Sequence, residues 1–223
     1  MVNIGADMNQ HRVNIRFFDE VKRVIRFVKQ YIRGIHTFKK VGPCITLYGS
    51  HRLDQGVYYT QAKALGFALS KAGYAIMTGG GPGIMEAANA GAYEAKGVSC
   101  GCAIEIPGEQ KVNPYVTHWA LFEYFFMRKI MLTRFSIGFI ALPGGYGTLD
   151  ELFEMLTLIV TEKIKCYPVV LFGVDFWHPL YDTLKNHFVK HGTLHQDELD
   201  KIFITDSIPD VLSFLEQQLS SSS

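Results

Sequence analysis

Cysteine is scarce in this 223-residue chain, and long apolar runs are missing. The four cysteines, Cys44, Cys100, Cys102 and Cys166, contain no C-x-x-C pair, so the sequence offers no disulfide framework and no paired-cysteine metal motif. We therefore expect reduced thiols, as in a cytoplasmic protein. No stretch of about 18 uncharged apolar residues occurs, which predicts no membrane span. The first residues lack the apolar h-region of a secretory signal.

A strong excess of charge of either sign is also absent. Lysine and arginine number 22 against 21 aspartate and glutamate, for a net charge of +1. This balance gives no global electrostatic reason to bind nucleic acid or an anionic membrane, so we expect neither as a partner. Apolar residues make up 48% of the chain and charged residues 19%, which is ample for a core.

The chain has no internal repeat, linker or break in composition. Residues 1–15 are polar, and an amphipathic helix with a basic opposite face is expected from Phe17. We assign residues 1–40 to an N-terminal segment with this helix and residues 41–219 to a single domain. A nucleic-acid role for the basic face is the alternative to a solvated one.

Apolar runs alternate with helical patterns through the rest of the chain. Strands apolar on both sides, separated by helices, predict an α/β fold with a mainly parallel sheet flanked by helices. Among the details, Asp54 is expected to cap a helix that Gly73 ends, residues 116–126 to form a strand, and Pro179 to lie in a first helical turn.

Three strands end in small-residue loops: "YGSHR" (48–52), "TGGGPG" (78–83) and "PGGYGT" (143–148). The carboxyl ends of parallel strands share one edge of a sheet, so the loops should gather on one rim. Two of them run into a helix N-terminus, where unpaired amides and the helix dipole favour a phosphate. Tight turns without any ligand are the alternative. The residues expected to contact a ligand are Gly49, Ser50, Gly80, Gly81, Gly83, Glu86, Lys129, Gly144, Gly145, Gly147 and Thr148.

These loops differ from the common nucleotide motifs. Neither of the two loops that run into a helix has the Gly-Lys-Ser/Thr ending of the Walker phosphate loop. The dinucleotide fingerprint lacks its acidic partner, because Glu105 at about the right spacing alternates within a strand. NAD binding stays a minor alternative.

Two charged residues are expected on the same rim. Glu151 follows "PGGYGT" in the first turn of a helix, and Arg128 and Lys129 begin the preceding helix. The alternative for Glu151 is a capping box with Thr148, since "TLDE" has that pattern. The alternative for Arg128 and Lys129 is a solvated or salt-bridged pair.

An anion cradle, an arginine and a carboxylate suit cleavage of a nucleotide's glycosidic bond. Such reactions pass through an oxocarbenium-like sugar, and a carboxylate could stabilise its positive charge or activate water. The arginine could hold the phosphate or the leaving base. The group that protonates the base is unassigned, and a nucleotide-binding sensor or carrier without chemistry is the rival hypothesis.

The stretch "PGGYGTLDE" resembles the Pro-Gly-Gly-x-Gly-Thr-x-x-Glu signature of the LOG (Lonely Guy) family, the cytokinin riboside 5'-monophosphate phosphoribohydrolases. "GGGPGIMEAANAGA" and "MRK" resemble the same family in the same order, over about residues 44–173. The resemblance implies a Rossmann-like fold, a homodimer or higher homo-oligomer with the site near the subunit interface, and hydrolysis of a nucleoside 5'-monophosphate without cofactor or metal.

Residue by residue, the resemblance gives Arg128 and Glu151 the catalytic positions and Gly144, Gly145, Gly147 and Thr148 the phosphate site. Members are often labelled lysine decarboxylases, but no motif for a pyridoxal Schiff-base lysine is present. Phe126 and Met127 replace the His-Glu pair that many plant-like members have before Arg-Lys. The preferred base is therefore open: a cytokinin, adenine or another base.

Two further patterns carry weaker hypotheses. His187, His191 and His195 are spaced four residues apart, which could form a zinc site, but no H-E-x-x-H motif accompanies them. "FEYFF" is expected to be strand core rather than a platform on which a base stacks.

Overall fold

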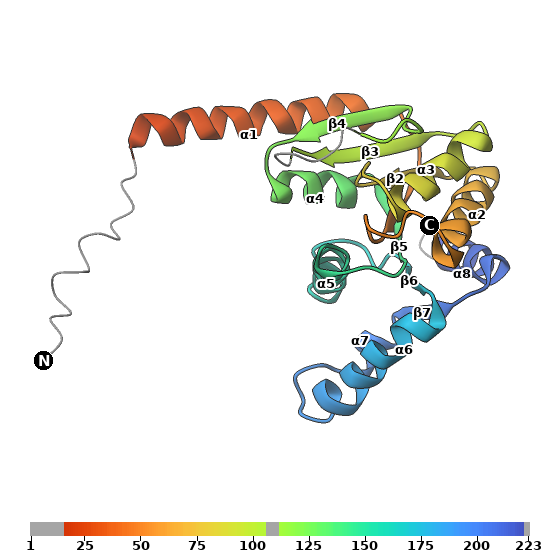
Figure 1. Ribbon diagram of the computed structural model, residues 1–223. Coiled ribbons are helices and arrows are strands. Elements are labelled where there is room, and N and C mark those ends of the chain that lie inside the picture. Colours follow the sequence, from red (N-terminus) through yellow and green to blue (C-terminus); the bar gives the residue numbers. More distant parts are fainter. Residues whose placement is uncertain (1–15, 106–111, 221–223) are drawn as a thin grey trace, which may run out of the picture.

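The computed structural model describes residues 16–105 and 112–220. Within them a seven-stranded sheet runs through the molecule, with the order β4-β3-β2-β1-β5-β6-β7 (Figure 1). Every neighbouring pair of strands is parallel. The strands are β1 (Cys44–Tyr48), β2 (Ala75–Thr78), β3 (Ser99–Ile104), β4 (His118–Phe122), β5 (Ser136–Ala141), β6 (Val169–Phe172) and β7 (Ile202–Thr205).

Helices connect the strands, as parallel pairing requires. The helices are α1 (Phe17–Phe38), α2 (Val57–Lys71), α3 (Ile84–Glu94), α4 (Phe125–Arg134), α5 (Tyr146–Val160), α6 (Val174–Thr183), the π-helical turn η1 (Leu184–Val189), α7 (Gln196–Leu199) and α8 (Ile208–Ser220). None of these helices in the described ranges is long and apolar enough to cross a membrane.

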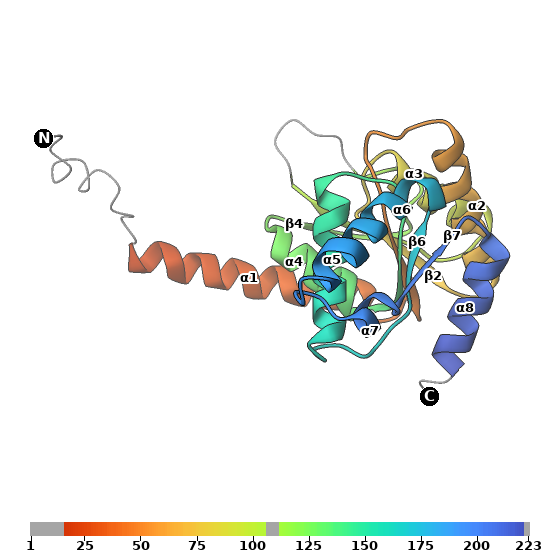
Figure 2. The same ribbon diagram turned by 90° about the horizontal axis from the view of Figure 1, so that it is seen from below.

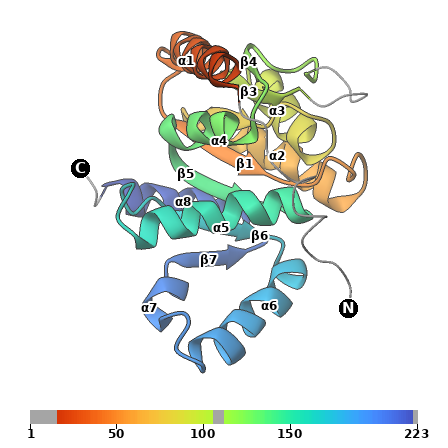
Figure 3. The same cartoon turned by 90° about the vertical axis from the view of Figure 1, so that its left-hand side faces the viewer.

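The helices form a layer on each face of the sheet (Figure 3). Side chains that alternate along β1 divide the core between the two faces of the sheet. Ile45 and Leu47 pack with α2, α3 and α8 on one face. Cys44 and Tyr48 point to the other face, where α1, α4, α5 and α6 supply the apolar side chains. The α/β three-layer fold predicted from the sequence is therefore confirmed.

The order in which the chain adds strands to the sheet changes direction beside β1. From β1 the strand order runs outward through β2 and β3 to β4, and the chain then returns to place β5 on the other side of β1. Open parallel sheets bind ligands in the crevice at such a switch point, outside the carboxyl ends of the strands. The loops after β1 and β5 lie on the two sides of this point.

Three sequence predictions about local structure are wrong. Asp54 does not cap α2, because Gly56 holds the N-cap position with a positive φ of 90° and no side-chain cap bond. The strand expected over 116–126 is only His118–Phe122, and Phe125 already begins α4. Pro179 is the sixth residue of α6 and so lies in its second turn, because the helix starts two residues earlier than expected. Gly73 does follow the end of α2 with a φ of 95°.

Helix α1 packs against the edge of the sheet and against α4. Its Phe27 contacts the ring of Tyr124 with centroids 4.7 Å apart. A Cβ at Gly34 would lie 2.6 Å from Sδ of Met131, so the two helices meet closely there. The boundary placed at residue 40 stays a prediction.

Candidate active site

The three glycine-containing loops meet at the carboxyl edge of the sheet. The amide of Ser50, after β1, donates to the carbonyl of Pro143, after β5, over 3.1 Å. The amide of Ile84 donates to the carbonyl of Ser50 over 3.0 Å, which brings in the start of α3. Gly83 has a φ of 70°, and a Cβ there would lie 2.5 Å from the Ser50 carbonyl oxygen. The loops therefore lie on one rim, as the sequence predicted.

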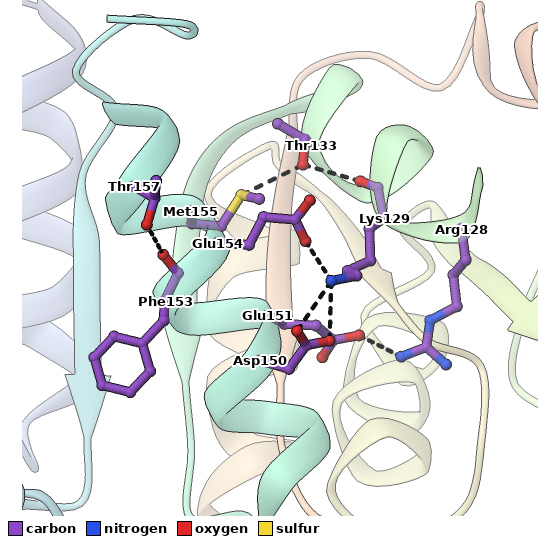
Figure 4. Close-up of polar contacts among 9 residues, drawn as sticks. All are labelled: Arg128, Lys129, Thr133, Asp150, Glu151, Phe153, Glu154, Met155 and Thr157. Carbon is purple, nitrogen blue, oxygen red and sulfur yellow. Dashed lines mark hydrogen bonds and ion pairs between the residues drawn. The ribbon is translucent and has the colours of Figure 1, made fainter. Parts of the chain in front are cut away.

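Arg128 and Glu151 form a buried ion pair on this rim. Nη2 of Arg128, in the first turn of α4, donates to Oε1 of Glu151 on α5 (Figure 4). The side chains are only 13% and 9% exposed. Nε of Arg128 is also buried and has no hydrogen-bond partner among the residues described. The pair thus retains an unused donor beside a carboxylate.

The loop after β2 packs directly on this guanidinium. A Cβ at Gly79 would lie 3.4 Å from both Cζ and Nη2 of Arg128. The ring of Phe125 lies on another side, 5.6 Å from Cζ to its centroid. Phe125 belongs to the "FEYFF" stretch, for which strand core was predicted. This is confirmed for Phe122, which is fully buried at the end of β4, and wrong for Phe125 and Phe126, which are exposed on α4.

Burial dominates the ionisation of the site. It raises the pKa of the Glu151 carboxyl above its ordinary value, and the charge and hydrogen bond of Arg128 offset this only in part. Burial also raises the pKa of the Tyr48 phenol well above its ordinary value, and the negative charge of Glu151 adds to the effect. Tyr48 ends β1 on this face of the sheet, so Glu151 lies close to the central strand.

The N-terminus of α5 is open. The helix begins at Tyr146 after the N-cap Gly145, and no side chain of the described residues caps it. A Cβ at Gly145 or Gly147 would have no neighbouring atom within 4 Å. The first turn of α5 is therefore uncapped and exposed at Gly145 and Gly147, and such a helix start favours an anion.

The alternative of a capping box between Thr148 and Glu151 is wrong. The helix starts before Thr148, so Thr148 is its third residue and Glu151 its sixth, in the second turn rather than the first. The Thr148 side chain is buried against the turn, where a Cβ at Gly144 would lie 2.1 Å from its Oγ1. Gly144 is thus needed for packing, whereas Gly145 and Gly147 are not.

Lys129 points toward carboxylates rather than into open space (Figure 4). Its Nζ lies 3.0 Å from Asp150 and 2.8 Å from Glu154. Burial lowers the pKa of Lys129, but the bonds to Glu154 and Asp150 outweigh it and the pKa is raised. The sequence reasoning expected Lys129 at the ligand and missed Asp150, which neighbours Glu151 in sequence. The structure thus shows Lys129 in a salt bridge, which was the alternative to its contact with a ligand.

A buried amide network fixes the loop after β2, and the sequence reasoning missed it. Asn89, fully buried in α3, accepts from the Thr78 hydroxyl over 2.6 Å and donates to Oγ of Ser99 over 2.8 Å. Nδ2 of Asn113 donates to Oδ1 of Asn89 over 3.0 Å and to the carbonyl of Gly81 over 3.2 Å. The sequence signal for this network was a single asparagine, Asn89, in the alanine-rich stretch "EAANAGA".

The remaining predicted residues lie around these contacts. Gly49 follows β1 and packs on Ile84, where a Cβ would come within 2.2 Å of Cγ2. Gly80 accepts through its carbonyl from the amide of Asn113 over 2.9 Å. Glu86 lies in the first turn of α3 near Tyr59. Partial burial raises the pKa of the Tyr59 phenol, and the negative charge of Glu86 raises it further.

The three histidines do not form a metal site in the part of the chain that the structure describes. No group of three or more potential ligands is close enough there to hold a metal ion. His187 lies in η1 and His195 precedes α7, so the chain turns between them.

Comparison with known proteins assigns the chain to a family. The family model described as "Possible lysine decarboxylase" matches residues 85–215, more than half of the chain. Curated relatives carry LOG names. The "Cytokinin riboside 5'-monophosphate phosphoribohydrolase LOG" of Oryza sativa subsp. japonica is 40% identical over 70 residues, 31% of this chain and 28% of that protein. LOG4 of Arabidopsis thaliana is 33% identical over 93 residues, 40% of this chain and 41% of that protein. The chain thus aligns with less than half the length of either relative.

Solved structures support the fold. The molybdenum cofactor carrier protein of Chlamydomonas reinhardtii superposes with a TM-score of 0.59 at 22% identity, covering 80% of this chain and 98% of that one. The molybdenum cofactor binding protein of Rippkaea orientalis gives 0.59 at 23% identity, covering 78% and 96%. At such identity the likeness shows the three-layer architecture alone.

Proposed function

Since this chain belongs to the family described as possible lysine decarboxylase, in which its LOG relatives lie, we propose that it is an N-glycosidase acting on a nucleoside 5'-monophosphate. It would hydrolyse the bond between sugar and base to give free base and ribose 5-phosphate. The observation that carries this proposal is the buried Arg128–Glu151 pair beside the open N-terminus of α5.

The phosphate is expected at the first amides of α5. Tyr146 and Glu151 are five residues apart on this helix, which separates them by about 7.5 Å along its axis. A nucleotide with its phosphate at the helix start would therefore extend its ribose toward Glu151. The exposed positions of Gly145 and Gly147 leave the amides accessible to the phosphate.

Glu151 is assigned to the sugar. As the bond from the anomeric carbon to the base nitrogen breaks, positive charge develops on the ribose, and an ionised carboxylate stabilises it. Water then bonds to the anomeric carbon, and one of its protons ends on the leaving base. The charge and the hydrogen bond of Arg128 favour the ionised form of Glu151, and the guanidinium retains N–H groups that could donate to a nucleotide oxygen.

A lysine decarboxylase activity has no support at this rim. A Schiff-base lysine must lose its proton, which a lowered pKa favours. Lys129 has a raised pKa and is held by Asp150 and Glu154. Its ammonium is better explained as a tie between α4 and α5.

We also propose that the protein is cytoplasmic and works as a homodimer with the site near the interface. Large apolar side chains are exposed on α4 and α5, the two helices that carry the ion pair, which fits a covered surface. They are Phe125, Phe126 and Ile130 on α4, and Tyr146 and Phe153 on α5.

Incubation with AMP and with isopentenyladenosine 5'-monophosphate, followed by chromatography of the free base, tests the activity. Adenosine is the matched control, since it lacks the phosphate that α5 is expected to bind and should be cleaved poorly. Binding of nucleotides without base release across a broad panel would reject the enzyme and favour the sensor or carrier.

A further inference from the structure

Helix α1 carries an exposed apolar seam. Its members are spaced alternately three and four residues apart, the period of a coiled coil. They are Phe18, Val21, Ile25, Val28 and Ile32, with exposed fractions of 78%, 40%, 48%, 51% and 49%. This seam is separate from the rim loops and goes beyond the proposed enzymatic function.

Other sides of α1 are already in contact with the body. Phe27 packs on Tyr124 and Phe126, and Gly34 lies against Met131. Gln30 and Arg26 both contact Glu123 at the end of β4. The orientation of α1 is therefore fixed with the seam facing away from these contacts, and its N-terminal half runs beyond the sheet (Figures 1 and 2).

The exposed apolar area is at the upper end of what a typical monomer shows, and it is about three quarters of what one partner buries in a standard dimer. With Phe17 and Val24 beside it, the seam exposes on the order of 600 Å² of apolar side chain, taking about 150–200 Å² for each fully exposed residue. A stable dimer buries about 800 Å² per partner. The largest apolar patch of a typical monomer is about 300–600 Å². A helix that runs out into water is also marginal unless it packs on something.

We propose that the seam binds the seam of a second copy of this chain, as a parallel two-helix coiled coil. Ile25 and Ile32 occupy the same core position of the repeat and are branched at Cβ, as two-stranded parallel coiled coils prefer at one of their two core positions. The charges select the direction. Lys22 and Lys29 flank the seam on one side, and Phe17 and Val24 on the other.

In a parallel pair, each lysine lies beside the apolar flank of the other helix, where its aliphatic stem covers Phe17 or Val24 of the second copy. In an antiparallel pair the lysine flanks would face each other, and like charges would repel. The basic flank therefore favours the parallel arrangement.

Self-cross-linking tests the seam in the full-length chain. In a parallel pair, identical core residues meet across the axis. Ile25→Cys and Ile32→Cys, made in a Cys166→Ser background to remove the exposed thiol, should both form a disulfide-linked dimer under mild oxidation. Arg33→Cys, on the outer side of α1, is the matched control and should cross-link at least tenfold more slowly. Equal rates at all three positions would overturn the proposal.

Sedimentation velocity gives the second measurement. Val28→Glu should halve the sedimenting mass, because it breaks the contact between seams and leaves the proposed contact at α4 and α5 in place. Arg33→Glu, a larger change of charge, should leave the mass unchanged. An unchanged mass in Val28→Glu overturns the proposal. So does co-sedimentation of an uncross-linked chain with phosphatidylserine vesicles, which would assign the seam to a membrane surface.

Discussion

Arg128 and Glu151 are joined although their helices follow strands that lie far apart in the sheet. Arg128 is on α4, which leaves the edge strand β4, and Glu151 is on α5, which follows β5 beside the central β1. The return of α4 from the edge across the face of the sheet brings the guanidinium to the carboxylate. The candidate site therefore depends on the longest crossover in the sheet.

Replacing Glu151 by glutamine should abolish most of the turnover and leave nucleotide binding in place. The amide keeps the size of the side chain but cannot stabilise a positively charged sugar, so we expect kcat to fall by about 10²–10³-fold. Steady-state kinetics with AMP and equilibrium binding measure the two effects.

Glu94→Gln is the matched control, because Glu94 pairs with Lys63 on the surface and not with the rim. Turnover in Glu151→Gln equal to that of Glu94→Gln would remove Glu151 from the chemistry.

The pH profile of kcat/KM should report the buried carboxylate. Because burial raises the pKa of Glu151, activity that needs the ionised form should be lost on acidification at a pH above the ordinary value for glutamate. Arg128→Gln removes the charge that offsets this rise, so its acid limb should move to still higher pH. An acid limb at the same pH in both proteins would contradict the proposed role of the ion pair.

Stability should depend on pH through the same group. A raised pKa in the folded state means that the native protein holds this proton more tightly than the unfolded chain does. The associated stability is present below the unfolded pKa and lost as the pH rises through the folded pKa. The urea midpoint of Glu151→Gln should therefore fall less than that of the natural protein between acidic and neutral pH. An identical fall in both would show that Glu151 does not titrate in this way.

Gly147→Ala should stabilise the protein and weaken its substrate binding. An alanine Cβ meets no atom within 4 Å there, and glycine inside a helix costs about 0.5–1 kcal/mol relative to alanine. The Cβ leans toward the helix start, where the phosphate is expected. A raised thermal midpoint with a raised KM for AMP is the expected result. The exposed helical control Ser213→Ala should leave KM unchanged, and an unchanged KM in Gly147→Ala would place the phosphate elsewhere.

Asn89→Ala should destabilise the fold by about 2–4 kcal/mol, because it strips hydrogen-bond partners from several buried groups at once. These groups include the Thr78 hydroxyl and the Asn113 amide. Urea denaturation measures the loss, with exposed Asn186→Ala as the control. Equal midpoints for the two variants would show that the network contributes little.

Local sequence patterns were sufficient to predict the three layers of the fold and the rim that the loops share. Apolar strands and helical periodicity repeat every few residues, and parallel strands place their carboxyl ends on one edge whatever their order. For this reason the loops at Gly49, Gly83 and Gly144 could be placed together before the order of the strands was known.

Other features depend on where segments far apart in sequence come to lie. The sequence indicated that Thr148 could cap a helix, but the turn through Gly144 buries its side chain and starts α5 two residues earlier. It also led us to expect Lys129 at the ligand, with a salt-bridged pair as the alternative, and the packing of α4 beside α5 places two carboxylates next to its ammonium.

By itself the sequence determined that this chain is an α/β protein with glycine-lined turns at one rim, because periodicity, apolar content and glycine are local properties. Only the tertiary structure decided which charges meet there. The pairing of Arg128 with Glu151, and of Asn89 with Asn113, depends on strand order and helix packing. Burial of these groups then sets their ionisation and hydrogen bonding, because desolvation depends on every neighbouring segment and not on the residue alone.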